Sequence, residues 1–146
     1  MNTYNILLWG LRLAGVGQLF VAVIYFWVRG ILGWSQDLEK LRPHNKAIAH
    51  TYGRYIQAFN TVFGLICLFQ THELLNRTTL AADLTLLMGF YWLMRLVLQF
   101  IYYDVSEITA QRKLYHYGCY AFDLLFVLQT TPLLAAFGYN VGWLAR

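Results

Sequence analysis

Four stretches of the chain are predominantly apolar over about 20 residues or more. A helix that crosses the hydrocarbon core of a bilayer needs about 20 such residues. The pattern therefore predicts four membrane-spanning α-helices, at approximately residues 6–28, 50–69, 80–103 and 114–137. We expect an all-α fold, a four-transmembrane-helix bundle that forms one integral membrane domain over residues 1–146.

The longest connection, residues 29–49, mixes apolar and charged side chains. Ser35 is a suitable N-cap for a short helix, in which Leu38 and Leu41 lie on one side. Amphipathic segments of this kind lie in the headgroup plane of a membrane. We therefore expect a short interfacial helix after the first span, followed by Pro43 in the first turn of the next helix.

Composition supports lipid as the environment of most of the surface. Hydrophobic residues make up 59% of the chain and charged residues 12%, whereas soluble domains are about 45–50% apolar and about 25% charged. The net charge is +4, but the basic residues lie between apolar runs and not on a polar domain. This distribution predicts the lipid bilayer as a partner and argues against nucleic acid.

The basic residues also predict an orientation. Those of the first connection and its edges are Arg29, Lys40, Arg42, Lys46 and Arg54, and the third connection holds Arg112 and Lys113. The second connection holds only Arg77, and the C-terminus only Arg146. The positive-inside rule then places residues 29–49 and 104–113 in the cytoplasm and both termini outside.

Polar side chains interrupt three of the four predicted spans at a similar depth. Asn60, Arg95 and Asp123 each lie roughly 12–15 Å below the same membrane surface, at about 1.5 Å of helix per residue. Residues spaced three and four apart share a helix face, so each helix extends this level as a stripe. The predicted buried polar layer comprises Gln57, Asn60, Arg95, Gln99, Tyr102 and Asp123, and Met88 and Tyr91 lie on the same face of the third span.

The two charges in this layer are expected to pair with each other. An unpaired Arg or Asp at such a depth costs at least about 2.5–3.5 kcal/mol on insertion scales. We therefore expect an ion pair between Arg95 and Asp123. Such a pair either fixes the register of the helices or belongs to a proton, quinone or ion site, and the sequence leaves both interpretations open.

Small residues follow one face of the first predicted span. Gly10, Ala14 and Gly17 lie there, and Gly10 and Ala14 form a small-x-x-x-small pattern. Such a pattern permits close approach of two helices. It serves either ordinary packing inside the bundle or a dimerisation face.

Two histidines suggest one cofactor. His50 and His116 lie near the same predicted membrane edge on neighbouring helices, and two such side chains can ligate a haem b iron from opposite sides. The alternative is a pair of interfacial histidines bonded to water or headgroups. No metal site or catalytic residue is expected, because the sequence contains no Glu-x-x-His, zinc-protease, nucleophile-elbow or P-loop motif.

Three segments carry a resemblance to a known group of proteins. They are residues 15–19 (GVGQL), 42–65 (RPHNKAIAHTYGRYIQAFNTVFGL) and 91–104 (YWLMRLVLQFIYYD). Together they resemble a group of small four-span bacterial integral membrane proteins with no established activity. The resemblance implies a four-helix protein of the bacterial inner membrane, and it transfers no catalytic residue.

Three functional hypotheses follow. The short connections leave little chain for a soluble active site, which favours a non-catalytic helical membrane subunit or accessory protein of a larger membrane assembly. Its partners would be other membrane protein chains or further copies of itself. The first alternative is a redox protein that handles quinone or haem, based on the polar layer and the histidines. The second is a small transporter, which would have to be oligomeric because four spans leave little room for a cavity.

Overall fold

The computed structural model of the chain describes residues 2–102 and 113–144, and the side chains of 113–116 are outside this description. Every element in this part of the chain is helical, which confirms the all-α prediction. The elements in chain order are α1 (Thr3–Ile31), α2 (Trp34–Glu39), α3 (Pro43–Phe69), the 3₁₀ turn η1 (Glu73–Leu75), α4 (Thr79–Ile101) and α6 (Lys113–Asn140). Most of the connection predicted at 104–113 lies outside the described residues.

Three of the long helices are long and apolar enough to cross a membrane. They comprise Thr3–Ile31, Thr79–Ile101 and Tyr117–Asn140. The fourth predicted span, residues 50–69, is also helical but belongs to a longer helix, α3, which is not among the three. The first half of α3 adds Lys46, Arg54 and other polar side chains, which lower its hydropathy.

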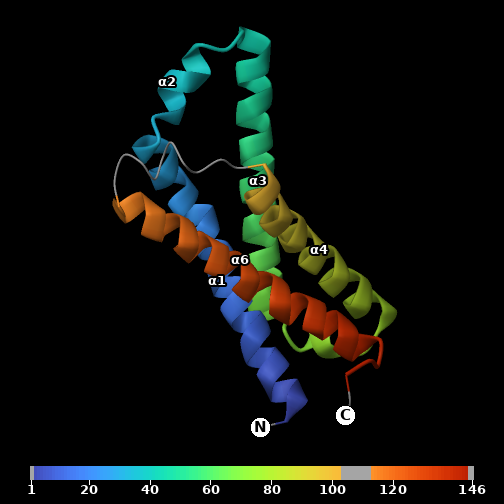
Figure 1. The fold of residues 1–146 in the computed structure, drawn as a ribbon. Helices are drawn as coiled ribbons and strands as arrows, with labels where there is room; N and C mark the ends of the chain where they lie inside the picture. The colour runs from blue at the N-terminus through green and yellow to red at the C-terminus, as the bar shows by residue number, and fades with distance from the viewer. Residues whose placement is uncertain (1, 103–112, 145–146) are drawn as a thin grey trace.

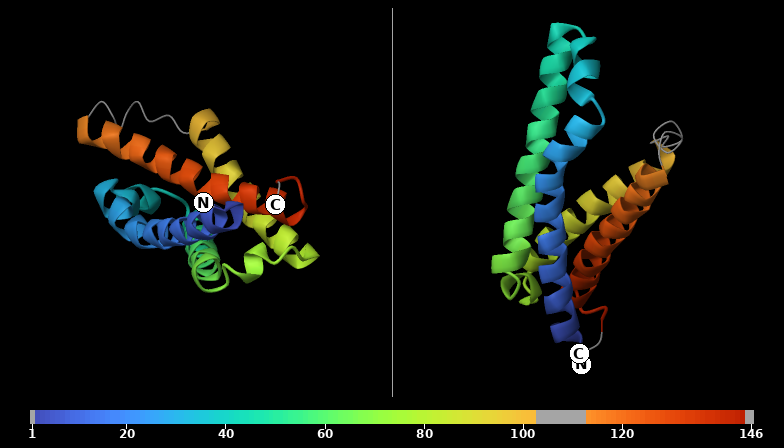
Figure 2. Two further views of the ribbon diagram at one scale, coloured as in Figure 1. Left: turned by 90° about the horizontal axis from the view of Figure 1, so that it is seen from below. Right: turned by 90° about the vertical axis from the view of Figure 1, so that its left-hand side faces the viewer.

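The long helices form two antiparallel pairs (Figure 1). α1 packs against α3, α4 packs against α6, and a contact between α1 and α6 joins the two pairs. The pairs lie close together where η1 and both chain termini are found, and they diverge toward α2, as the right-hand view in Figure 2 shows. We call these the closed end and the open end. The expected four-helix bundle is therefore two hairpins joined mainly at one end.

Glycines allow the helices of each pair to approach closely. A Cβ atom added at Gly15 of α1 would lie 2.9 Å from the carbonyl oxygen of Gly64 in α3. A Cβ added at Gly89 of α4 would lie 2.7 Å from a methyl carbon of Leu134 in α6. The carbonyl oxygen of Gly64 is a backbone atom that cannot turn aside, so the spacing of α1 and α3 requires glycine at position 15. At Gly89 the Leu134 side chain can shift, and the closest backbone atom is the Leu134 nitrogen at 3.3 Å.

Asn140 connects several elements at the closed end through hydrogen bonds. Its Oδ1 accepts a hydrogen bond from the backbone N–H of Arg77 at 3.1 Å, and its Nδ2 donates to the carbonyl of Leu74 at 2.8 Å. The same Nδ2 lies 3.5 Å from Oγ1 of Thr85 in α4. One side chain at the end of α6 thus holds η1, the following turn and α4 together.

The short helix expected after the first span is present as α2, although its N-cap is different. Gly33, with φ of 65°, occupies the cap position, and Ser35 lies inside the helix. Glycine reaches this left-handed conformation at no steric cost. Lys40 donates to Asp37 at 2.9 Å, and this hydrogen bond and the carboxylate charge raise the pKa of Lys40. Pro43 begins α3 as expected, while the headgroup position of α2 stays a prediction.

The contact between Gly15 and Gly64 can be tested with two matched substitutions in α1. We expect Gly15→Ala to lower the free energy of unfolding by about 1–3 kcal/mol, because the added methyl group forces the two backbones apart. Gly30→Ala is the control, since a Cβ there meets nothing within 4 Å. The melting temperatures of both variants are measured by thermal unfolding in detergent, monitored by circular dichroism. Equal melting temperatures for the two variants would contradict the close approach.

The hydrogen bonds of Asn140 at the closed end predict a second change in stability. Asn140→Ala removes the partners of a backbone N–H and a backbone carbonyl, so we expect a loss of about 1–3 kcal/mol in unfolding free energy. Asn5→Ala, an exposed asparagine at the same end of the molecule, should leave stability nearly unchanged. The same detergent unfolding measurement applies, and the idea fails if both variants melt like the unmodified protein.

Candidate functional site

The predicted polar layer is partly assembled between the two helix pairs. Asn60 of α3 is 2% exposed, and its Oδ1 accepts a hydrogen bond from the hydroxyl of Tyr91 in α4 at 2.9 Å. This bond links one helix pair to the other. Met88, on the same face of α4, is fully buried.

Arg95 makes different contacts from those predicted. Its guanidinium donates to Oε1 of Gln99 at 2.8 Å and lies 4.7 Å from the ring centre of Phe126 in α6. Among the residues that the structure describes, the ion pair is Lys40–Asp37. The expected Arg95–Asp123 pair is therefore wrong as a direct contact.

The geometry of the helices explains this difference. Gln99 is one helical turn from Arg95 on the same face, so it offers an acceptor without any tertiary contact. Phe126, nearly one turn beyond Asp123, presents its ring to the guanidinium, and a cation over an aromatic face is a favourable contact. Arg95 thus contacts α6 through the aromatic ring of Phe126.

Two acceptors of the predicted layer are buried without a hydrogen-bond donor. They are Oδ1 of Asp123 and Oε1 of Gln57, judged over the described part of the chain. A buried acceptor that lacks a donor costs about 1–3 kcal/mol, and more when it is charged. These atoms are therefore the positions in the layer whose hydrogen-bonding capacity the described residues leave unmet.

Tyr102 does not belong to the layer. Its side chain is 82% exposed, because it is the C-cap of α4 and lies beyond the last helical turn at the open end. A phenol in such a place suits the interface between membrane and water. The sequence placed it in the layer by extending the third span to residue 103, which is two residues past the observed helix.

An aromatic cluster fills the space beside the polar groups. Trp92 is 1% exposed and stacks on Phe126, with ring centres 5.6 Å apart and an angle of 29° between the planes. Tyr91 meets Trp92 edge to face at 5.4 Å. The indole Nε1 of Trp92 is buried and has no acceptor in the described part of the chain. Sequence reasoning missed this cluster, because an apolar run does not show which of its aromatic side chains point into the protein and which point outward.

Two buried glutamines were also missed. Gln18 of α1 and Gln129 of α6 are both fully buried. Nε2 of Gln18 lies 3.7 Å from Sγ of Cys67, a long contact to a weak acceptor. Neither polar atom of the Gln129 amide has a partner among the described residues. The sequence signal that would have identified them is a glutamine inside a long apolar run, because such residues are rare there.

The small-residue face of α1 packs against α6 of the same chain. A Cβ added at Gly10 would lie 3.0 Å from Pro132, and one added at Gly17 would lie 3.1 Å from Nε2 of Gln129. Ala14, between these glycines, is 1% exposed. Packing within the chain therefore occupies the surface that the sequence also offered as a dimerisation face.

The two predicted haem ligands are not both described. His50 lies on α3 and is half-buried, whereas the side chain of His116 lies outside the described residues. The two-histidine arrangement therefore stays a prediction. Within the described ranges, no group of three or more His, Cys, Asp and Glu side chains is placed to hold a metal ion.

Comparison with known proteins adds no relative. No protein family model, no curated protein and no solved structure matches this chain. The resemblance to small four-span bacterial membrane proteins therefore remains an expectation from the sequence. The functional inference has to come from the geometry of the helices and the buried polar atoms.

Proposed function

We propose that this chain is a non-catalytic helical subunit or accessory protein of a larger membrane assembly. The observation that carries this proposal is the buried Oδ1 of Asp123, which has no hydrogen-bond donor among the described residues. A carboxylate at membrane depth is costly, and polar groups hydrogen-bond between neighbouring membrane helices. A partner chain that contacts the exposed part of the half-buried Asp123 side chain would offer this carboxylate a donor.

The distribution of the chain between helices and connections supports the same function. The segments between successive described helices are only a few residues long at residues 32–33, 40–42 and 76–78. Large apolar side chains are exposed on all four long helices, among them Trp27, Phe69, Ile101 and Leu124. Such a surface suits lateral contact with lipid and with partner helices.

The proposal includes α3 as a fourth membrane crossing. α3 has 27 residues, which at about 1.5 Å per residue is longer than the roughly 30 Å of a bilayer core. It runs antiparallel to α1 and packs against it (Figure 1), and its second half exposes Phe59, Val62 and Phe69. With the basic first connection in the cytoplasm of a bacterial cell, both termini lie outside.

One observation favours a second candidate, a quinone-handling redox protein. The indole N–H of Trp92, which has no acceptor among the described residues, lies in an aromatic cluster beside Arg95. Quinones present carbonyl acceptors on a flat ring, so an indole donor among aromatic faces suits them. This candidate predicts that a quinone is extracted with the purified protein by organic solvent.

The subunit proposal is tested at Asp123. We expect the protein in mild detergent to have a mass larger than one chain by light scattering. Asp123→Leu should reduce this mass to one chain, because it removes the acceptor that the partner satisfies. Replacing buried charged groups with apolar side chains of similar volume is often neutral or stabilising, so we expect the melting temperature of the single chain not to fall.

Asp83→Asn is the control variant, since Asp83 is an exposed acid on α4, and it should leave the mass unchanged. A single-chain mass for the unmodified protein would contradict the subunit proposal, and so would an Asp123→Leu variant that keeps its partners. A single-chain protein that carries an extractable quinone would favour the second candidate.

A further inference from the structure

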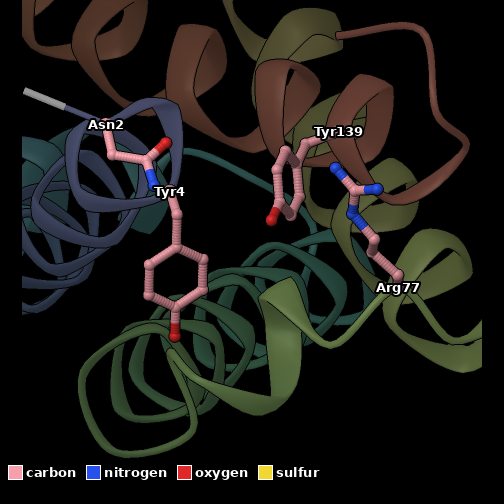
Figure 3. A pocket seen from close by; sticks show the side chains of 4 residues that line it. All are labelled: Asn2, Tyr4, Arg77 and Tyr139. Carbon is pink, nitrogen blue, oxygen red and sulfur yellow. The ribbon is translucent and has the colours of Figure 1, made fainter. Parts of the chain in front are cut away.

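An open cavity of about 390 Å³ lies at the closed end of the molecule. Its lining residues are Asn2, Tyr4, Arg77 and Tyr139 (Figure 3). They come from three separate parts of the chain, namely the start of α1, the turn before α4 and the end of α6. None of the four is acidic, so the cavity wall carries a net positive charge from Arg77.

The backbone of Arg77 is held in an uncommon conformation. Its φ is 56°, a left-handed value that few residues other than glycine adopt. The hydrogen bond from its N–H to Oδ1 of Asn140 fixes the turn there. Strained residues of this kind persist where the surrounding structure holds them, and they are frequent at binding sites.

The side chain of Arg77 is also positioned. Its guanidinium carbon lies 4.2 Å from the ring centre of Tyr139, and Figure 3 shows the two side chains next to each other. The ring attracts the charge through its face but accepts no conventional hydrogen bond. No acidic group within the described ranges forms an ion pair with this guanidinium, so its fork of N–H donors is available to an anion.

Two further groups line the cavity with hydrogen-bonding capacity. The Asn2 side chain makes no capping hydrogen bond to α1, so its amide is available. The hydroxyl of Tyr139 points toward the space beside Tyr4 (Figure 3). Tyr4 itself is engaged, because its hydroxyl lies 2.7 Å from Nδ1 of His72.

Exposed apolar side chains mark the level of this cavity. Trp9, Phe69, Leu80 and Trp143 are all more than 60% exposed, and they belong to different elements around the closed end. Aromatic side chains concentrate where the acyl region of a membrane meets the headgroups. Given the proposed membrane insertion, the cavity opens at the level of phospholipid headgroups.

We propose that this cavity binds a phosphate group, with Arg77 as the cationic ligand and the Tyr139 hydroxyl as a further donor. A guanidinium can donate hydrogen bonds to two phosphate oxygens at once. The cavity wall contains no carboxylate that would repel the phosphate or compete with it for Arg77. The phosphate belongs either to a phospholipid headgroup or to a free anion. This site is separate from the polar layer and from Asp123.

The test uses the full chain in a non-ionic detergent. It is titrated with dioctanoyl-phosphatidylglycerol, with dioctanoylglycerol, which lacks phosphate, and with inorganic phosphate, and tryptophan fluorescence follows binding. We expect Arg77→Gln to weaken phosphate-dependent binding by at least about tenfold, which is the effect of losing one charge-assisted contact. Arg12→Gln is the matched control, because Arg12 also lies over an aromatic ring, that of Trp9 at 5.4 Å, but lines no part of the cavity.

A second variant keeps the proposal testable if Arg77→Gln folds poorly. Arg77→Gly relieves the left-handed backbone, so it should fold at least as stably while it also loses phosphate binding. Binding of the phospholipid alone assigns the site to a lipid headgroup, and binding of both phosphate compounds assigns it to phosphate in general. The proposal would be overturned if dioctanoylglycerol bound as tightly as the phospholipid, or if neither phosphate compound bound. It would also be overturned if Arg12→Gln and Arg77→Gln weakened binding equally.

Discussion

The apolar outer surface is the constraint on which the rest of this structure depends. Each long helix exposes large hydrophobic side chains, and residues such as Trp27, Phe69 and Ile101 are more than 70% exposed. A surface of this kind is stable in lipid and prone to association in water. In lipid, each backbone N–H and C=O has to find its partner within the protein, and a helix provides these partners along its own length. A lipid environment therefore accounts for both the helical content and the apolar side chains on the outer surface.

In the lipid environment that we propose, apolar burial contributes little to holding the helices together, so close packing and polar contacts take its place. The glycines Gly15 and Gly64 let α1 and α3 touch, and Asn140 ties α6 to η1 and α4. These contacts are concentrated toward the closed end. Toward the open end the pairs diverge (Figure 2), and buried polar atoms such as Oδ1 of Asp123 keep unmet hydrogen-bonding capacity. This contrast between the two ends is the basis of the proposed role as a subunit.

The sequence predicted the helices well and their contacts poorly. Long apolar runs indicate helices, but hydropathy alone does not show where a helix begins in a polar segment. The start of α3 was predicted from Pro43 and not from the apolar run at 50–69. Depth along a helix can be counted from the sequence, whereas the rotation of one helix against another cannot. The counted depth therefore predicted that Arg95 and Asp123 pair, whereas Arg95 bonds to Gln99 and lies over the ring of Phe126. Asn140 escaped notice because its main partners are backbone groups more than 60 residues away.

Whether α3 crosses the membrane is the most direct question for this interpretation. Single cysteines introduced as Ser35→Cys in α2 and Asn76→Cys after η1 flank α3 on its two ends, in a chain that also carries Cys67→Ala and Cys119→Ser. Labelling of intact cells and of opened membranes with a membrane-impermeant maleimide reports the side on which each cysteine lies. A crossing helix predicts that the two positions label from opposite sides, with Asn76→Cys accessible from outside. Labelling of both positions from the same side would contradict it.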